Sequence, residues 1–595
     1  MKLGFAKNRA PFSLLAIWLF WSLILLVSAA RSTAQLMTDP DDFMRMVQVR
    51  DWLSGQSWFD VTQYRIHPPQ GGSMHWSRLL DVPIAGVMLL GNLIGTPQSA
   101  ELSAIIIVPL ALFGCLMLLV FGITNQLANE KIALLAAFLL PTYPLILRQF
   151  LPGRVDHHSW QILMAGLALF AFFRTGSKKS PIILGGAIAF WMHVSIEGLP
   201  YAVIFGSILA IFYLFPKLSN EREGDNRLVS YLNSLALFSA VFFIMTQSPN
   251  KMTIAYCDAV SWPLLATLMM VSAGMSVTHI FTKGRPAVIK AAAMGLTGAA
   301  GIMFFLVFSD TCALNPFGQL SPLVQHFWHE TISEGLPVTK QAGAIVTLLI
   351  FVPLTFAIWI IYLISKSPLK FDLKKWLSLS FFVVSTSILS LNIQRTAGVA
   401  ELFALPGLAA LTASIVYRTQ MSKFMFVRVF ATVFAIAALS PMTSFVAANT
   451  MSADTANTVA ATGPDRSNKR DCSMNELSVL EPGLIFTTMA AGPEILYRTK
   501  HTVFASGYHR NHVIMDQLIA TMLGPTDKAF QTLHAAHVRY VVFCPTHFEA
   551  QSYLRAGKDG FASMLTGDRH PEWLQPVPAF ANSKMRVFRF ENSGQ

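Results

Sequence analysis

The residues best able to do chemistry in this sequence form short ionisable clusters between long apolar runs. The first cluster, Thr38-Asp39-Pro40-Asp41-Asp42-Phe43-Met44-Arg45, holds three carboxylates within four residues. The second, Asp156-His157-His158, places a carboxylate and two imidazoles just before an apolar run typical of a helix. Carboxylate oxygens bind hard divalent cations, and an imidazole beside them suits an ion such as Mn²⁺. Both clusters therefore indicate metal-ion chemistry, with a solvated loop and a capped helix start as the ordinary alternatives.

Two further candidates follow later in the chain. The segment Glu330-Thr331-Ile332-Ser333-Glu334 carries two carboxylates, and its ordinary interpretation is a polar turn. Arg395 is a lone cation beside apolar runs, where it could anchor a helix, bind a lipid phosphate or contact a substrate phosphate. The elements that position these four candidates decide between the alternatives.

The composition excludes an ordinary soluble enzyme. Of the 595 residues, 53% are hydrophobic and 13% are charged, whereas a soluble protein carries about 25% charged residues. The mean hydropathy is +0.50. The formal net charge of +12 would by itself allow a nucleic-acid binder or a protein that faces anionic lipid.

The chain is predicted to be an α-helical polytopic membrane protein with about 13 transmembrane helices. The first apolar run, 11–30, can cross about 30 Å of hydrocarbon and exceeds the apolar part of a cleaved signal peptide, so we expect a retained helix. Residues 82–95 are too few to cross and are expected to form a re-entrant or interfacial segment. The other spans are predicted at 101–124, 132–147, 157–173, 181–194, 199–215, 229–246, 261–282, 291–308, 341–364, 376–391, 398–416 and 428–446.

The basic residues mark one side of the membrane. With the N-terminus in the cytoplasm and 82–95 not spanning, the predicted cytoplasmic loops hold twenty lysines and arginines against five acidic residues. Short cytoplasmic loops collect basic residues in this way. The positive charge therefore reports topology: we expect the lipid bilayer as a partner, no nucleic acid, and a bacterial inner membrane as the location.

The remaining pieces lie on the extracytoplasmic side, where all four candidates also fall. Strand-like and helix-like runs alternate in the last piece, which predicts an α/β domain. Cys472 and Cys544 both lie in that domain, on a side where disulfides persist, and a bond between them is left open. The predicted parts are a transmembrane domain 1–446 with external loops 31–100 and 309–340, a linker 447–470 and a soluble domain 471–595.

The order and common side of these motifs resemble the GT-C membrane glycosyltransferases, and most closely the catalytic subunit of oligosaccharyltransferase with its archaeal and bacterial relatives. That family has thirteen transmembrane helices, two large external loops and a C-terminal external domain. Its first-loop motif, Asp-Pro with an Arg six residues after the Asp, fits Asp39-Pro40 and Arg45. Its archaeal Asp-His-His motif fits Asp156-His157-His158, and its Thr-Ile-x-Glu motif fits Thr331 to Glu334.

The resemblance implies a role for each of these residues. Asp39, Asp156 and Glu334 would be catalytic, and Arg395 would bind the donor phosphate. A divalent cation, Mn²⁺ or Mg²⁺, would be held by Asp39, Asp156, His158 and Glu334. The candidate substrate contacts are Asp41, Asp42, Arg45, His157, Trp76, Tyr508, His509 and Arg510.

One signature of the family is missing. Oligosaccharyltransferases carry a Trp-Trp-Asp motif that reads the Asn-x-Ser/Thr sequon, whereas this chain reads Ala490-Ala491-Gly492-Pro493-Glu494. The resemblance implies transfer of a sugar or oligosaccharide from a polyprenyl-phosphate or polyprenyl-pyrophosphate donor to an extracytoplasmic acceptor, assisted by the metal and inverting the anomeric carbon. The sugar, the number of phosphates, the oligomeric state and the acceptor, whether protein, glycan or lipid, are left open. A transporter or flippase of such lipids is the alternative.

Overall fold

The computed structural model describes residues 10–31, 36–219, 224–309, 317–366, 372–456 and 472–591. Within these residues the chain divides into two compact units. The first unit comprises Met1–Leu36, Val82–Pro316 and Ser333–Thr458, and the second comprises Met37–Asp81, Phe317–Ile332 and Val459–Gln595. The boundaries 1–446, 447–470 and 471–595 stay a prediction, and residues 457–470 of the predicted linker lie outside the described residues.

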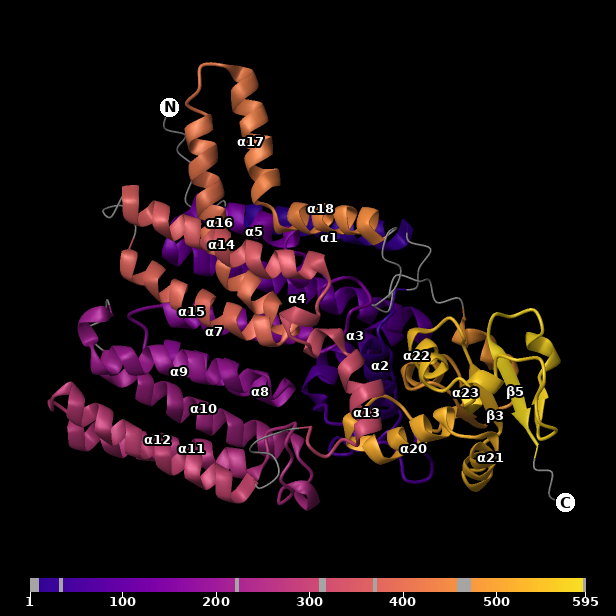
Figure 1. The fold of residues 1–595 in the computed structure, drawn as a ribbon. Coiled ribbons are helices and arrows are strands. Elements are labelled where there is room, and N and C mark those ends of the chain that lie inside the picture. The colour runs from indigo at the N-terminus through magenta and orange to yellow at the C-terminus, as the bar shows by residue number, and fades with distance from the viewer. Residues whose placement is uncertain are drawn as a thin grey trace. The chain divides into compact units, whose positions relative to one another are not determined.

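The first unit is built from apolar helices. In Figure 1, α10, α11 and α12 run side by side, and α10 also packs against α8. The helix α4 contains 31 residues, which corresponds to a length of about 46 Å. The helices of this unit are α1 (Ala10–Arg31), α3 (Asp81–Asn92), α4 (Pro97–Leu127), α5 (Glu130–Leu139), α6 (Pro144–Leu147), α7 (His158–Phe173), α8 (Ser180–Val194), α9 (Gly198–Leu214), α10 (Gly224–Thr246), α11 (Trp262–Thr282), α12 (Ala287–Ser309), α14 (Gly343–Lys366), α15 (Leu373–Asn392), α16 (Ala397–Thr419), α17 (Met425–Leu439) and α18 (Pro441–Ala456).

The apolar helices confirm a polytopic membrane protein. Among the described residues, seven helices are long and apolar enough to cross a membrane, and α17 with α18 would make one further span bent by 72°. Three shorter apolar helices, α7, α8 and α9, add to these. The total of 13 spans stays a prediction. The segment predicted at 82–95 forms α3, whose 12 residues are too few for a span.

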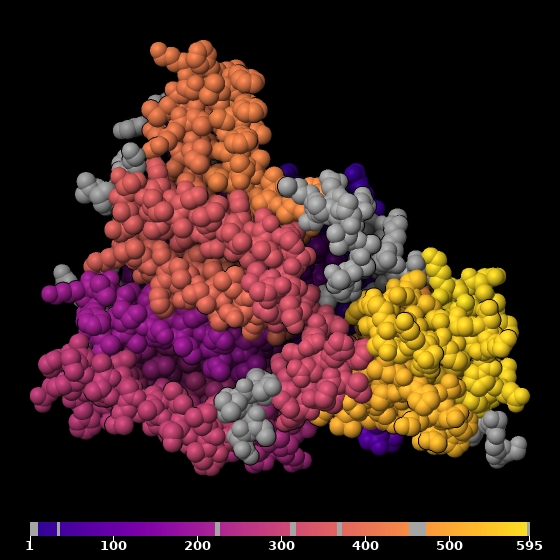
Figure 2. Space-filling view, in the orientation of Figure 1, coloured from indigo at the N-terminus to yellow at the C-terminus, as the bar shows by residue number. Residues whose placement is uncertain are grey.

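Prolines divide two of the predicted spans. In the run 132–147, α5 ends at Leu139 and the short α6 begins at Pro144, because Pro141 and Pro144 interrupt the run and a proline removes a backbone donor and crowds the preceding turn. The run 428–446 is likewise split before Pro441. Helix α17, which precedes this break, is highly exposed. Along it stack the rings of Phe426, Phe430 and Phe434. The end of α16 together with α17 stands away from the rest of the first unit (Figure 2). Lipid is the solvent that such an apolar surface requires.

The turn that precedes α7 requires a glycine. Gly153 has φ +94°, and a Cβ built there would lie 2.2 Å from the carbonyl oxygen of Leu36. The backbone N–H of Gly153 donates to the carbonyl of Ile105 at 2.8 Å. The glycine therefore lets the chain pass close to two backbone segments just before the cluster at Asp156.

The second unit contains the α/β domain that the sequence predicts. Its five-stranded sheet has the order β2-β1-β3-β5-β4. The strand β1 pairs in parallel with β2 and β3, and β5 pairs antiparallel with β3 and β4. Its strands and helices are β1 (Leu484–Phe486), β2 (Thr502–Val503), β3 (Tyr540–Phe543), β4 (Leu574–Pro576), β5 (Arg586–Phe590), α2 (Pro40–Leu53), α13 (Pro322–Phe327), α19 (Gly492–Arg498), α20 (His512–Leu523), α21 (Thr526–Ala535), α22 (Phe548–Ala556) and α23 (Phe561–Met564).

Part of the first external loop belongs to this α/β unit. Ile66 forms a parallel bridge with Val503, beyond the edge of the sheet. The guanidinium of Arg65 donates to the carbonyl oxygens of Leu496, Thr499 and His501. The loop segment thus satisfies backbone carbonyls that the C-terminal domain would otherwise leave open.

Candidate active site

The Asp156-His157-His158 cluster lies at the start of α7, just after the Gly153 turn. Asp156 and His158 are buried, and each of the three side chains offers one ligand atom within 4.8 Å of the others. His157 Nδ1 lies 2.5 Å from Asp156 Oδ1, and His158 Nε2 lies 3.5 Å from Asp156 Oδ2. Each of the two carboxylate oxygens of Asp156 thus faces one histidine. This donor set fits a divalent ion that accepts both oxygen and imidazole ligands.

Glu334 joins the cluster from the segment 309–340, the predicted second external loop. It lies in the short helix η7 (Ser333–Gly335), and its Oε2 is 3.5 Å from His158 Nε2. Its Oε1 accepts a hydrogen bond of 3.0 Å from Arg148 Nη2. Burial raises the pKa of Glu334, but the positive charges of His158 and of three nearby arginines lower it to about 2. Glu334 is therefore ionised at neutral pH.

The carboxylate of Asp156 is ionised for a similar reason. Burial raises its pKa, but His157, His158 and Arg154 lower the pKa well below its ordinary value. Three negative or lone-pair-bearing groups, from Asp156, His158 and Glu334, therefore converge. Their mutual repulsion is relieved by a cation between them.

Arg395 lies close to the same cluster and is paired. It belongs to η9 (Gln394–Thr396), and its Nη2 forms an ion pair with Glu197 Oε1. Its Nε is buried and has no hydrogen-bond partner among the described residues. The backbone N–H of Gln394 donates to the carbonyl of Leu336 at 3.3 Å, which joins the loop of Arg395 to the loop of Glu334.

A pocket opens between these groups within the first unit. One wall is formed by Trp191 and Tyr201, whose rings stack with centroids 4.2 Å apart. Carboxylates and guanidinium groups line the same cavity, so its lining combines an apolar face with charged groups. Its charged and titratable lining residues are Arg148, His158, Glu197, Glu334 and Arg395.

The first sequence motif lies in the second unit. Asp39 caps α2, and its Oδ1 accepts a hydrogen bond of 3.1 Å from the backbone N–H of Asp41. Asp42 is fully buried. The cap explains the local role of Asp39, while its predicted catalytic role and the predicted substrate contacts of Asp41 and Asp42 stay predictions.

Arg45 is part of a buried ionic network in the second unit. Its Nη1 lies 3.0 Å from Asp81 Oδ1, and its guanidinium lies 4.5 Å from the ring centroid of Trp76. Asp81 Oδ2 also accepts from Gln48 Nε2 at 2.8 Å and from Arg78 Nη1 at 3.4 Å. These contacts give Arg45 and Trp76 a packing role. Their predicted contacts with substrate stay predictions.

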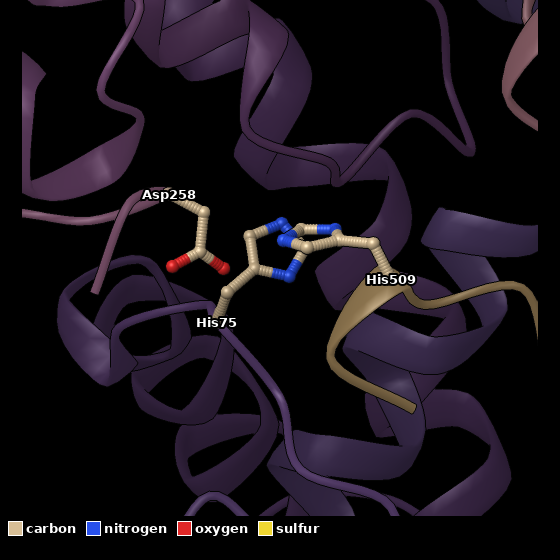
Figure 3. A group of neighbouring side chains, drawn as sticks. All are labelled: His75, Asp258 and His509. Atoms are coloured by element: carbon tan, nitrogen blue, oxygen red, sulfur yellow. The ribbon is translucent and has the colours of Figure 1, made fainter. Parts of the chain in front are cut away.

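Tyr508, His509 and Arg510 face residues of the first external loop within the second unit. Arg510 Nη1 donates to the carbonyl of Met74 at 3.0 Å. The ring of His509 lies 4.6 Å from that of His75, centroid to centroid, and both rings are labelled in Figure 3. The predicted substrate contacts of these three residues stay predictions.

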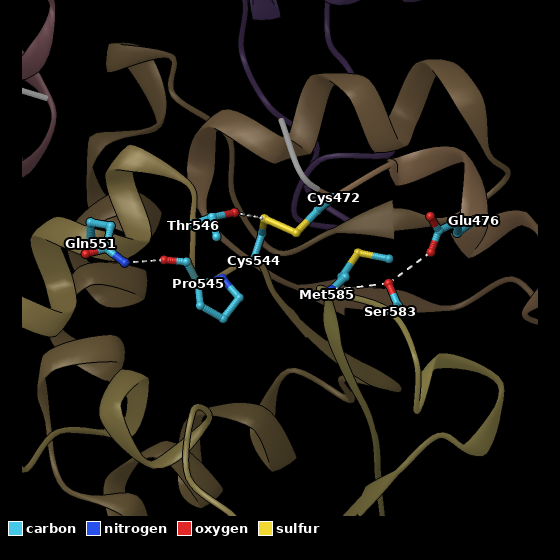
Figure 4. The surroundings of a disulfide bond; sticks show 8 residues. All are labelled: Cys472, Glu476, Cys544, Pro545, Thr546, Gln551, Ser583 and Met585. Atoms are coloured by element: carbon cyan, nitrogen blue, oxygen red, sulfur yellow. Dashed lines mark hydrogen bonds between the residues drawn. A yellow bond between two sulfur atoms is a disulfide. The ribbon is translucent and has the colours of Figure 1, made fainter. Parts of the chain in front are cut away.

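The sulfur chemistry left open by the sequence is settled in the structure. Cys472 and Cys544 form a disulfide that joins the start of the described α/β domain to the end of β3 (Figure 4). Thr546 lies beside it, with its Oγ1 3.4 Å from Cys544 Sγ. Cys257 is also disulfide-bonded, and Cys115 in α4 is free.

Sequence analysis did not assign three polar residues to this pocket: Arg148, Gln161 and Glu197. Arg148 pairs with Glu334, and Gln161 lies between His158 and Glu197. The sequence signals were weak: Arg148 follows an apolar run, and Glu197 is one of few acidic residues between two apolar runs. Neither spacing nor residue type indicates that these groups converge on His158 and Arg395.

Part of the chain is similar in sequence to a known archaeal protein. No family model matches the chain. Over 203 residues it is 28% identical to dolichyl-phosphooligosaccharide-protein glycotransferase 2 of Archaeoglobus fulgidus. The aligned region covers 34% of this chain and 31% of the relative. The chain therefore matches about a third of the length of that curated relative.

Solved structures extend the similarity to almost the whole chain. The archaeal oligosaccharyltransferase AglB from Archaeoglobus fulgidus, in complex with an inhibitory peptide and a dolichol-phosphate, gives a TM-score of 0.65 at 16% identity, covering 91% of this chain and 71% of that one. The apo form gives 0.64 at 16% identity, with 99% and 75% covered. A complex of the same enzyme with Zn and sulfate gives 0.58 at 14% identity, with 98% and 73% covered.

These findings show that the chain has the fold of the solved oligosaccharyltransferase structures, with a small C-terminal sheet domain. The predicted resemblance and fold class are confirmed. The protein is an integral membrane protein, and its buried Asp156-His157-His158 group has the composition of a metal-ion site.

Proposed function

We propose that this protein is a membrane glycosyltransferase that moves a sugar or oligosaccharide from a polyprenyl-linked phosphate or pyrophosphate donor to an extracytoplasmic acceptor. The observation that carries the proposal is the convergence of the carboxylates of Asp156 and Glu334 on His158, in a pocket that His158 and Glu334 line together with Arg395. The curated relative and the solved structures, all glycosyltransferases, support transfer rather than the alternative of transport.

The chemistry of a lipid-linked donor matches these groups. When the bond to the anomeric carbon breaks, negative charge builds on the oxygens of the departing phosphate. Asp156, His158 and Glu334 would hold Mn²⁺ or Mg²⁺, which when bound supplies Lewis-acid stabilisation of that charge. Arg395 adds a cationic contact through a guanidinium that matches the geometry of phosphate oxygens.

Other groups in the chain supply orientation and a base. Arg148 holds Glu334 through its 3.0 Å hydrogen bond, so the loop carboxylate is fixed toward His158. We assign Asp39 to orienting or deprotonating the acceptor, on the strength of its sequence motif. A single displacement of the phosphate by the acceptor would invert the anomeric carbon.

The disulfides and the distribution of charge support a proposal for the side of the membrane. We propose that the N-terminus lies in the cytoplasm of a bacterial cell and that the second unit lies outside the inner membrane. The disulfide of Cys472 and Cys544 and the bonded state of Cys257 support this placement, because such bonds persist in oxidising compartments. A reporter fused after residue 128 should be cytoplasmic, and one fused after residue 320 external.

The test is cleavage of a donor by the full chain in detergent. The protein is incubated with a polyprenyl-pyrophosphate-linked sugar and, separately, with the monophosphate, each with an envelope extract as the source of the acceptor and with Mn²⁺, Mg²⁺ or EDTA. We expect consumption that needs the metal and is lost in Glu334→Ala, while Glu330→Ala, an exposed change in the same loop, keeps it. If both lipids bind and neither is cleaved in Mn²⁺, in Mg²⁺ or in EDTA, transfer is contradicted. Mass spectrometry of envelope glycans and lipid-linked sugars from a deletion strain then identifies the sugar and the acceptor.

A further inference from the structure

A chain of hydrogen bonds leads from the proposed metal ligands to the proposed phosphate contact. Gln161 lies one turn after His158 on α7, and its Oε1 is 3.0 Å from His158 Nδ1. Its Nε2 donates to Glu197 Oε2 at 3.1 Å. The other oxygen of Glu197 pairs with Arg395. All four residues belong to the first unit.

The chemistry of these groups allows only one direction of donation along the chain. The guanidinium of Arg395 stays protonated, and a carboxylate paired with it can only accept hydrogen bonds. The amide nitrogen of Gln161 must therefore face Glu197, and its oxygen must face His158. In the neutral imidazole that binds a metal ion, the proton then lies on Nδ1, and the lone pair of Nε2 faces the carboxylates of Asp156 and Glu334, each 3.5 Å away.

We propose that Gln161 and Glu197 are positioning residues that hold His158 as a metal ligand and couple metal binding to phosphate binding at Arg395. The proposal rests on the proposed function for the identity of the two ligands. Metal-binding histidines almost always donate their other ring N–H to an acceptor, and loss of that acceptor typically costs about 10- to 100-fold in metal affinity. Gln161 is that acceptor here, and Glu197 determines its orientation.

The coupling has a second structural basis at the far end of the chain. Glu197 occupies one nitrogen of Arg395, while Nε is buried and has no partner among the described residues. The guanidinium therefore has its orientation set by Glu197 and retains donors for an anionic ligand. Because binding free energies are reciprocal, a phosphate bound at Arg395 and a metal bound at His158 should strengthen each other by the same factor.

The variants follow from the donor and acceptor pattern. Gln161→Leu removes the acceptor of His158. Glu197→Gln keeps the shape but places an amide nitrogen against that of Gln161, which must turn and present its own N–H groups to His158. The double variant Gln161→Glu with Glu197→Gln restores the pattern, because the carboxylate introduced at position 161 would accept from both neighbours while the new amide oxygen at position 197 accepts from Arg395. The matched control is Gln126→Leu, at the C-terminal end of α4 in the first unit.

The experiment measures Mn²⁺ affinity of the full chain in detergent by the paramagnetic resonance signal of free Mn²⁺, with and without added polyprenyl phosphate. We expect about 10- to 100-fold weaker binding in each single variant, recovery in the double variant and no change in the control. Polyprenyl phosphate should tighten Mn²⁺ binding in the wild type and lose this effect in Glu197→Gln. Thermal unfolding of each variant verifies that the fold is kept.

Two results would overturn the inference. One is Mn²⁺ affinity in Gln161→Leu and Glu197→Gln equal to that of the control. The other is a loss in both single variants that the double variant does not recover, since a role in packing alone would give that pattern. Failure of the proposed function is distinguishable, because the Mn²⁺ measurements keep the predicted pattern when no sugar is transferred.

Discussion

Arg45 and Asp81 allow a structural role and a chemical role to be separated by experiment. Asp81 is fully buried and is the shared acceptor for Arg45, Arg78 and Gln48, at 3.0, 3.4 and 2.8 Å. Asp81→Asn keeps the shape but removes the negative charge that offsets two buried guanidinium groups. Breaking a buried ion pair by removing one partner costs about 3–5 kcal/mol. At roughly 2–4 °C per kcal/mol for a unit of this size, the unfolding temperature should fall by roughly 6–20 °C.

The assay is thermal unfolding of the full chain in detergent, monitored by tryptophan fluorescence and by protease sensitivity of the second unit. Asp559→Asn, the same change on the surface of that unit, should leave the transition in place. Arg45→Met should cost less than Asp81→Asn, because Asp81 then keeps Arg78 and Gln48. An Asp81→Asn protein that melts with the Asp559→Asn control would refute the structural role of the network.

Three further perturbations test other parts of the structure. Cys544→Ser opens a disulfide between residues 72 positions apart, for which loop entropy predicts a loss of about 4 kcal/mol; reductant should lower wild-type stability to the same level. Gly153→Ala should cost about 1–3 kcal/mol and weaken Mn²⁺ binding, because a Cβ there collides with the Leu36 carbonyl at 2.2 Å; unchanged Mn²⁺ affinity would contradict this. Burial raises the pKa of Glu549 above its ordinary value of 4.5, although hydrogen bonds to it lower that pKa. Its contribution to stability is therefore complete below the unfolded-state pKa and lost as the pH rises through the folded-state pKa, so the stability of the wild type relative to Glu549→Gln, measured by urea unfolding, should fall with pH.

Much of the candidate site was predictable because residue types constrain it strongly. Asp39, Asp156, His158 and Glu334 were predicted as one ligand set from the family resemblance of their motifs. The structure brings the carboxylates of Asp156 and Glu334 to 3.5 Å from the Nε2 of His158, while the metal role of Asp39 stays a prediction. Arg395 was predicted beside them and lines the same pocket. The buried ion pair of Arg45 with Asp81 was not predictable from the motif, and the substrate contact that the motif indicates for Arg45 stays a prediction.

The partners of these residues were not predictable from spacing. Arg148 and Glu334 are separated by 186 positions, and Gln161 and Glu197 by 36. No local periodicity relates such positions, because each pair depends on how separate helices pack. The break at Pro141 and Pro144 was visible in the residues, yet its position inside an apolar run concealed it.

The sequence by itself determined that the chain is a helical membrane protein and which of its residues could bind a metal ion. Long apolar runs must form helices in lipid, where every backbone N–H and C=O has to be satisfied internally, and the basic loops predict their orientation. Only the tertiary structure decided which polar groups meet. A hydrogen bond requires atoms within about 3 Å, and the packing of α7 and α9 with the loops of Glu334 and Arg395 brings His158, Gln161 and Glu197 into one connected chain.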